Sequence, residues 1–309
     1  MTNTPFPVGQ PTPLAPDVTC ILAPNASPMT FWGTNTYLLG HDSLVIIDPG
    51  PNDPAHFDAV IAAINDRPVT HILLTHSHLD HSPMAQPLGQ TVNAPVFAFG
   101  DSMTGRSPVM TKLAQAGLAG GGEGIDHDFK PDICLRDGET LTGPWGQITA
   151  IHTPGHIGNH LCFCWKDAIF TGDHVMGWAS SLVSPPDGDL TDFMASCARL
   201  KDLPAAVYYP GHGGPITTPH ARLDWLINHR LNREKQLRQA LTSGPQDVET
   251  LTAQLYADVA PGLHKAAARN VFAHLVDLCE RGQVSALPQL SPKAKFALIG
   301  ADIDGENGM

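Results

Sequence analysis

Short apolar runs alternate with clusters of turn residues along the first two thirds of the chain. Runs of roughly four to eight residues that are bounded by Gly, Pro, Asn and Asp predict β-strands. We expect strands at residues 34–39, 43–47, 69–74, 95–99, 139–141, 147–152, 160–165, 168–170 and 207–209. Phe57, Val60, Ile61 and Ile64 recur at helical spacing and predict an amphipathic helix over residues 54–66.

Two segments lack such a pattern. Residues 1–28 are rich in Pro, Thr and Asn and predict an extended arm or a loosely packed strand. Residues 101–131 contain the stretch Ala-Gly-Gly-Gly-Glu-Gly at 119–124, which is typical of a flexible loop. Loops of this length are usually functional or disordered, so both a substrate lid and an ordinary insertion remain open.

The last third of the chain has a different character. Helical spacing of apolar residues predicts helices at 219–240, 248–256 and 264–280, and two short runs at 283–287 and 295–298 predict a β-wing. The acidic residues 302–306 predict a disordered tail. We therefore expect three parts: an N-terminal arm (1–28), a main domain (29–220), and a long helix with a winged-helix-like domain (221–309).

Charge is distributed unevenly along the 309 residues. Residues 1–220 hold 8 Lys and Arg against 20 Asp and Glu, whereas residues 221–309 hold 10 against 10. The acidic main domain argues against a general grip on phosphate backbones, although bound divalent ions would offset part of that charge. No apolar run reaches membrane-spanning length and no signal segment begins the chain, so a soluble cytoplasmic protein is expected.

The six cysteines are scattered and form no Cys-x-x-Cys pair. This spacing favours free thiols in a reducing compartment over a disulfide framework. Cys162 and Cys164 lie two apart in an apolar run, where core packing is favoured over metal binding.

The densest chemistry lies in residues 75–82, Thr-His-Ser-His-Leu-Asp-His-Ser, directly after an apolar run. His76 and His78 are two apart, so an extended backbone would point both in one direction. Asp80 and His81 follow after a bend and can serve a different face or a second ion. Imidazole and carboxylate together suit zinc and related metals. The alternative is a histidine-rich surface loop.

Three later strands also end in candidate ligands. His156 follows a Pro-Gly turn after strand 147–152, Asp173 follows strand 168–170, and His212 follows strand 207–209. One histidine at a strand end would be an ordinary surface residue. Three such ends, each with a neighbouring glycine, favour a shared site.

In these motifs, over residues 30–215, the chain resembles the metallo-β-lactamase superfamily. The resemblance implies an α/β (α+β) fold, the four-layer αβ/βα sandwich, with two metal ions at one edge. His76, His78 and His156 would bind one ion, and Asp80, His81 and His212 the other. Asp173 would bridge the two ions, which agrees with the ability of a carboxylate to span neighbouring metals.

This ligand set predicts a hydrolase with two divalent ions, with zinc as the first expectation and manganese or iron as alternatives. The two ions would share a water, lower its pKa and present a bridging hydroxide, while one ion polarises the substrate oxygen. Asp80 would orient that hydroxide and take its proton, so it is the predicted catalytic residue.

A narrower resemblance is to the β-lactamase-like protein 2 branch. It rests on the string His-Arg-x-x-Arg-Glu at residues 229–234, on His160 four residues after His156, and on the C-terminal pattern. His160 and His174 are candidates for contacts behind the ligands or with substrate. Segment 177–189 is longer and richer in Pro and Gly than that branch leads us to expect, so the pocket can differ.

The branch implies a single-strand endoribonuclease, but no basic strip with interleaved aromatics accompanies the metal motifs. The residues Arg230, Arg233, Lys235 and Arg238 could follow a nucleic-acid backbone. We favour a solvated helix face paired with Asp224 and Glu234.

Several functions therefore stay open. The first is hydrolysis of an ester, thioester, lactone or phosphodiester, with an endoribonuclease or a glyoxalase II-like thiolesterase as narrower alternatives. A di-iron redox protein and a nucleic-acid-binding module are the alternatives of other classes. The expected partners are a small molecule or a single-stranded nucleic acid, not a membrane, and a homodimer is possible. The C-terminal domain would complete the active-site wall or support that dimer.

Overall fold

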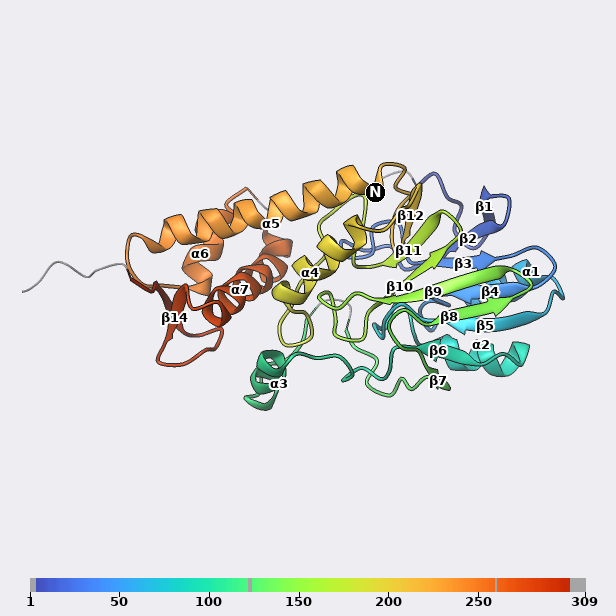
Figure 1. The fold of residues 1–309 in the computed structure, drawn as a ribbon, viewed down its shortest axis with the longest axis horizontal. Coiled ribbons are helices and arrows are strands. Elements are labelled where there is room, and N and C mark those ends of the chain that lie inside the picture. Colours follow the sequence, from blue (N-terminus) through green and yellow to red (C-terminus); the bar gives the residue numbers. More distant parts are fainter. Residues whose placement is uncertain (1–3, 122–123, 259, 301–309) are drawn as a thin grey trace, which may run out of the picture.

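Two β-sheets face each other in the computed structural model, which describes residues 4–121, 124–258 and 260–300 (Figure 1). The first sheet has seven strands in the order β1-β2-β3-β4-β5-β6-β7. Their bounds are Pro11–Ala15, Val18–Leu22, Asn35–Leu39, Leu44–Ile47, Val69–Leu73, Val96–Ala98 and Ile133–Cys134. Strands β4 to β7 are parallel, so their carboxyl ends lie at one edge of the sheet.

The second sheet has five strands in the order β12-β11-β10-β9-β8. The bounds of β8 to β12 are Thr140–Gly143, Gly146–His152, Leu161–Trp165, Ala168–Gly172 and Val207–Pro210. Strands β8 to β11 pair antiparallel, and β11 pairs parallel with β12. The expected strands are thus present, with ends that differ by one or two residues.

Alternation along each strand builds the two faces of a sheet. Tyr37 and Leu39 of β3 point into the apolar layer between the sheets, where they meet Phe163 and Phe170 of the second sheet. Leu38, between them, points to the opposite face and packs beneath the helices. One buried face per sheet fixes the register, because a slip of one residue would exchange the two faces.

Helices cover both outer faces. Helices α1 (Pro54–Ile64) and α2 (Ala85–Val92) pack on the first sheet, and α4 (Leu190–Lys201) and the start of α5 (Pro219–Leu241) pack on the second. Asp53 caps α1 by accepting a hydrogen bond from the backbone N–H of His56, and Pro54 occupies the first turn. The expected four-layer sandwich is confirmed.

The C-terminal domain forms its own core at the far end of α5 (Figure 1). It contains α6 (Val248–Leu255), a short 3₁₀ turn (Pro261–Leu263), α7 (His264–Glu280), and a three-stranded sheet. The strands of that sheet are β13 (Gln246–Asp247), β14 (Val284–Leu287) and β15 (Lys295–Leu298). Helices followed by this β-hairpin are the expected winged-helix arrangement.

The segment 101–131 is not a plain loop. It contains α3 (Pro108–Gln115), which begins at the cap Ser107. Met110 and Leu113 of this helix are buried in the core of the C-terminal domain. The segment therefore connects the main domain to the C-terminal domain by packing.

Other expectations need correction. Residues 11–22, expected as an extended arm or a loosely packed strand, form the hairpin β1–β2 of the first sheet; β1 is only partly buried, but β2 is almost wholly buried. Helices α2 and α4 were not predicted. The acidic stretch 302–306 lies outside the described residues. Within the described part of the chain, no helix is long and apolar enough to cross a membrane.

Only part of the expected solvated basic face of α5 is present: Lys235 and Arg238 are exposed, whereas Arg230 and Arg233 are not. Arg230 is 2% exposed, and Arg233 donates to the carbonyl oxygen of Leu255 and stacks over Tyr256. Arg238 lies 4.0 Å from Glu234, so only part of the predicted pairing occurs. Asp224 pairs with Lys201 of α4 instead.

Candidate metal centre

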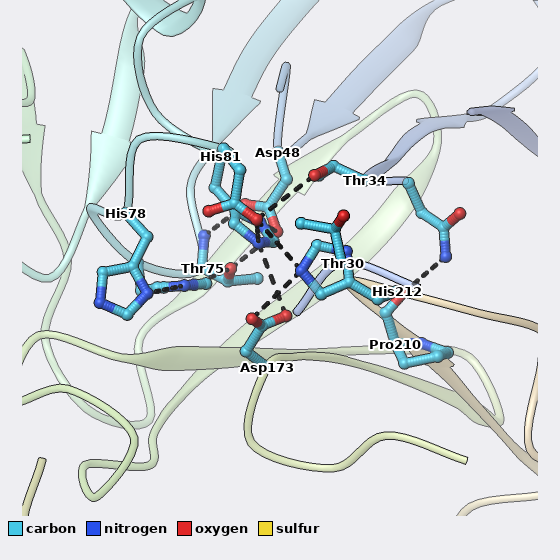
Figure 2. A network of polar contacts seen from close by, with 12 residues as sticks. Thr30, Thr34, Asp48, Thr75, His78, His81, Asp173, Pro210 and His212 are labelled. Atoms are coloured by element: carbon cyan, nitrogen blue, oxygen red, sulfur yellow. Dashed lines mark hydrogen bonds and ion pairs between the residues drawn. The ribbon is translucent and has the colours of Figure 1, made fainter. Parts of the chain in front are cut away.

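The metal-ligand candidates gather where strands of both sheets end. Residues 74–82 leave the carboxyl end of β5, and the loops after β9, β11 and β12 approach from the second sheet. Figure 2 shows Asp173 and His212, which follow β11 and β12, close to His81. Within the described residues, two groups of side chains place ligand atoms within 4.8 Å of one another. The first cluster is His76, His78 and His156, and the second cluster is Asp80, His81, Asp173 and His212.

Three imidazole nitrogens converge in the first cluster. His78 Nδ1 lies 3.1 Å from His76 Nε2 and 3.0 Å from His156 Nε2. All three rings are buried, and burial lowers the pKa of each, that of His78 to about 3 with a further contribution from His156. Three neutral rings with converging lone pairs form a ligand set that a cation fits.

Carboxylates and imidazoles alternate in the second cluster. His212 Nε2 lies 3.1 Å from Asp80 Oδ2 and 3.2 Å from Asp173 Oδ2, and His81 Nε2 lies 3.4 Å from Asp80 Oδ2. Asp173 Oδ2 is also 3.7 Å from His156 Nε2 in the first cluster. Asp173 is thus the residue between the two clusters, in the position where a bridging carboxylate is predicted.

Electrostatics separate the two clusters. Burial alone would lower the pKa of His212, but the carboxylates of Asp173 and Asp80 outweigh it and raise that pKa to about 10. His81 has a pKa well above its usual value for the same reason. Burial would raise the pKa of Asp80 and Asp173, yet the neighbouring imidazoles hold both well below their usual range. Both carboxylates are therefore ionised, as metal ligands must be.

The ligand rings are held from behind through their other nitrogens. His156 Nδ1 donates to the carbonyl oxygen of Leu182 at 2.8 Å, and His212 Nδ1 donates to that of Gly33 at 3.0 Å. Such contacts fix the ring orientation and the tautomer that leaves the opposite nitrogen free for a metal. Thr75 Oγ1 lies 2.9 Å from His76 Nδ1 and acts similarly.

Asp48 is a site residue that sequence reasoning missed. Its Oδ2 lies 3.0 Å from His81 Nδ1 and accepts a hydrogen bond from the Thr75 hydroxyl, and its Oδ1 accepts one from the Thr75 backbone (Figure 2). The sequence Asp-Pro-Gly after β4 is typical of a turn. Its position at the carboxyl end of a buried strand beside β5 is the signal that could have identified it.

The donor set fits two divalent ions. Asp173 Oδ1 and His81 Nε2 are buried, lie 3.5 Å apart, and have no hydrogen-bond partner among the described residues. Leaving such atoms without a partner is costly, and a bound cation would satisfy them. Imidazole and carboxylate ligands admit zinc, manganese and iron alike, so the ligands do not choose the metal.

His160 and His174, predicted to lie behind the ligands or to contact substrate, are fully buried. His160 stacks at 5.2 Å on the ring of His76, and its Nδ1 lies 2.9 Å from Thr153 Oγ1. His174 lies 3.5 Å from Cys197 Sγ. The first therefore supports a ligand from behind, and neither side chain reaches the pocket described below.

A pocket opens beside the two clusters. It is lined by ligands from both, by the apolar side chains Met29, Met176 and Leu182, and by Asp187. Asp187 also lines an adjoining cavity of about 470 Å³, together with residues of segment 103–127. Its carboxylate is buried and pairs at 2.7 Å with Arg106.

The cavity wall is held by the C-terminal domain. Arg269 of α7 donates to the carbonyl oxygens of Ala119, Gly120 and Pro185 and to the Ser184 hydroxyl. Segments 101–131 and 177–189 thus both border the space beside the ligands.

The thiols lie apart from this chemistry. Cys162 and Cys164 of β10 are free, and burial raises the pKa of Cys162 well above its usual range. The Thr153 hydroxyl approaches the Cys162 sulfur at 3.2 Å. Neither cysteine belongs to a ligand cluster, which agrees with the predicted packing role.

Two family models match the chain. One, described as "Metallo-beta-lactamase superfamily", matches residues 29–212 and so includes every residue of both clusters. The other, described as "Beta-lactamase associated winged helix domain", matches residues 248–289.

Individual proteins are similar over nearly the whole length. A "Beta-lactamase-like protein 2 homolog" of Caenorhabditis elegans is 31% identical and the match covers 95% of this chain and 93% of that protein. An atrochrysone carboxyl ACP thioesterase of Paecilomyces divaricatus is 29% identical, with 92% and 87% covered. The crystal structure of a metallo-beta-lactamase family protein from Thermus thermophilus has a TM-score of 0.74 at 25% identity, covering 93% of this chain and 100% of that one.

Proposed function

The chain belongs to the metallo-β-lactamase superfamily and is a metal-dependent hydrolase. On that premise we propose that it cleaves an acyl thioester or a related ester with two bound divalent ions, for which zinc is our first candidate. The predicted resemblance, with its winged-helix domain, is confirmed.

The observation that carries the choice of substrate is the lining of the pocket beside the ligands. Apart from the ligands, the lining consists of Met29, Met176 and Leu182 together with Gly121, Ser184 and Asp187. Two arginines lie nearby: Arg106 is paired with Asp187, and Arg269 donates to the Ser184 hydroxyl and to backbone carbonyl oxygens of the wall. Two divalent ions would outweigh the carboxylates of Asp80 and Asp173, so the choice rests on the side chains farther from the ions, where no lysine or arginine is among the lining residues of this pocket. An acyl chain can pack against Met29, Met176 and Leu182, whereas the polar groups of a sugar–phosphate chain would lie there without partners. The name of the thioesterase relative supports the same choice.

When bound, the divalent ions would polarise the carbonyl oxygen and lower the pKa of a water molecule toward neutrality. Asp80 is the residue we propose as the general base. Its Oδ2 is held by His212 at 3.1 Å and by the Thr34 hydroxyl at 3.4 Å, while its Oδ1 has no partner among the described residues. That oxygen is available to orient a water and accept its proton.

Met29, Met176 and Leu182 would exclude bulk water around the substrate, which strengthens the interaction of the carbonyl with the charges of the site.

A substrate panel tests the proposal. The zinc-loaded protein would be assayed with an N-acetylcysteamine acyl thioester, S-lactoylglutathione, a p-nitrophenyl ester, bis(p-nitrophenyl) phosphate and a single-stranded RNA. We expect kcat/KM for a thioester to exceed that for the phosphodiester at least tenfold. Asp80→Asn should abolish turnover while the protein stays folded, as judged by circular dichroism.

Preferred cleavage of the RNA would replace this proposal by the endoribonuclease alternative. If Asp80→Asn turned over every substrate as fast as the wild type, Asp80 would not be the general base. Metal analysis of the protein as purified decides between zinc and the other metals, and iron with redox-active spectra would instead favour the di-iron alternative.

A further inference from the structure

We propose that Asn270 and Arg230, outside both ligand clusters, are positioning residues for the metal centre, through which the C-terminal domain holds His156 and Asp173 in place. The inference concerns retention of metal and does not depend on the substrate proposed above.

Arg230 is buried without an acidic partner. Its side chain lies in α5, and within the described part of the chain no carboxylate stands within ion-pair distance of it. Its guanidinium donates to Asn270 Oδ1 at 3.0 Å and to the carbonyl oxygen of Ser181, and lies over the ring of Phe193. A buried cation is costly, and the neutral oxygens of Ser181 and Asn270 take the place of a counter-ion at its two terminal nitrogens, while its Nε has no partner among the described residues.

Asn270 of α7 joins this arginine to the loop after β11. Its Oδ1 accepts from Arg230 and also from the backbone N–H of Val183 at 3.2 Å. One amide oxygen therefore holds both the guanidinium and the loop. The Asn270 Nδ2 donates to the carbonyl oxygen of Ala266 at 3.4 Å, which fixes the orientation of the amide.

The loop held in this way touches a ligand from each cluster. The Ser181 hydroxyl contacts the backbone carbonyl oxygens of Asp173 and His174. The carbonyl oxygen of Leu182 accepts the hydrogen bond from His156 Nδ1 at 2.8 Å. Residues 181–183 thus connect the two pairs of residues. Arg230 contacts Ser181 and Asn270 contacts Val183, while Ser181 contacts the backbone of Asp173 and Leu182 contacts the side chain of His156.

The physical consequence falls on metal affinity. Partners behind a ligating histidine set its ring direction, and their loss typically costs roughly 10–100-fold in metal affinity or activity. Without the Asn270 oxygen, the Val183 N–H and one Arg230 donor would lose their partner, and the Leu182 carbonyl would lose its fixed position. The affinity for the ion that His76, His78 and His156 would bind should fall most, because the ring orientation of His156 is fixed by the Leu182 carbonyl oxygen.

Asn270 offers a matched pair of variants. Asn270→Leu removes the shared oxygen at similar volume. Asn270→Asp keeps an acceptor oxygen at the same place and adds an opposite charge for Arg230. If Asn270 served only in packing, both variants should lower stability and zinc affinity to a similar extent. If it positions the metal ligands, only Asn270→Leu should lower zinc affinity.

The test uses the full-length protein with zinc and no substrate. Zinc stoichiometry and affinity are measured by competition with a chromogenic chelator, and the melting temperature of the metal-free protein is measured by calorimetry. We expect Asn270→Leu to bind one of its two zinc ions about tenfold or more weakly. Asn270→Asp should keep both ions near wild-type affinity, and the metal-free proteins should melt within a few degrees of each other.

Wild-type zinc affinity in Asn270→Leu would overturn the proposal, and so would equal losses in the Leu and Asp variants. If Asn270→Leu does not fold, zinc affinity is measured in Arg230→Lys instead. Lysine keeps the charge but cannot present the planar fork that reaches both Ser181 and Asn270, so selective zinc loss is again expected. Unchanged zinc binding in that variant would also reject the proposal.

Discussion

Asp48 Oδ2 lies 3.0 Å from Nδ1 of His81, so a carboxylate that follows β4 orients a ligand that follows β5. Asp48 has φ of 50°, in the left-handed region that Asn tolerates better than most residues. Asp48→Asn therefore removes the charge without adding backbone strain. We expect zinc affinity and kcat to fall about tenfold or more.

Chelator competition and steady-state assays check this expectation. Asp42→Asn is the control, because Asp42 lies just before the same strand with its side chain 95% exposed. Equal zinc affinity in the two variants would show that Asp48 does not orient His81.

Arg269→Ala should act on substrate binding rather than on metal. The substitution removes the donors that hold the Ala119 and Gly120 carbonyls against the Ser184–Pro185 wall. We expect KM to rise several-fold while kcat and zinc content change little, since losing binding common to ground and transition state affects KM alone. Lys265→Ala, an exposed change on the same helix, serves as control. A large fall in kcat with unchanged KM would contradict this role.

Gly155→Ala should destabilise the protein. Gly155 has φ of 137°, and an added Cβ would lie 2.3 Å from Cα and 2.5 Å from the backbone nitrogen of Phe193. Because backbone atoms of α4 cannot move aside cheaply, we expect a loss of about 2 kcal/mol or more in the free energy of unfolding. Denaturant titration measures it. Gly262→Ala, where a Cβ meets no atom within 4 Å, should change stability far less.

Asp192→Asn should make stability less sensitive to pH. Burial, with the nearby Asp189 carboxylate, raises the pKa of Asp192 from 3.8 to about 6. The stability that this group contributes is complete below the unfolded pKa and is lost as the pH rises through 6. Asp192→Asn should therefore raise the melting temperature at pH 8.

The expected gain at pH 8 is about 1 kcal/mol, after allowance for solvent screening of this partly exposed carboxyl, which corresponds to a few degrees. Melting curves of variant and wild type between pH 4 and pH 8 should converge toward the acid end. A constant difference across that range would assign the effect to something other than ionisation.

The sequence predicted the strands and the ligands for the same reason. A buried strand needs an apolar run and an end marked by turn residues, and His76, His156 and His212 all lie just beyond such ends. Helix α4 carries a readable signal that was overlooked, since Leu190, Phe193, Cys197 and Leu200 are its buried side and recur at helical spacing.

Other features depend on partners distant in the sequence. The Pro-rich strand β1 becomes part of a sheet only because β2 pairs with it on one side and with β3 on the other. Asp48 reaches His81 only through the parallel register that sets Ile47 beside Leu73. Arg230 shares the buried side of α5 with Leu223, Leu226 and Leu237, so its place in an apolar stripe was visible, but the neutral oxygens that accept it were not.

Each ligand cluster takes side chains from both sheets. His76 and His78 follow β5 of the first sheet whereas His156 follows β9 of the second, and Asp80 and His81 likewise face Asp173 and His212 from the second sheet. Each bound ion would thus act as a cross-link between two halves of the chain that also interlock through their apolar faces. A ligand that binds only the native state stabilises it by mass action, so metal supply becomes a control on folding as well as on turnover. In a cell short of the metal, newly made chains would be exposed longer to proteolysis, and the amount of enzyme would follow the amount of metal.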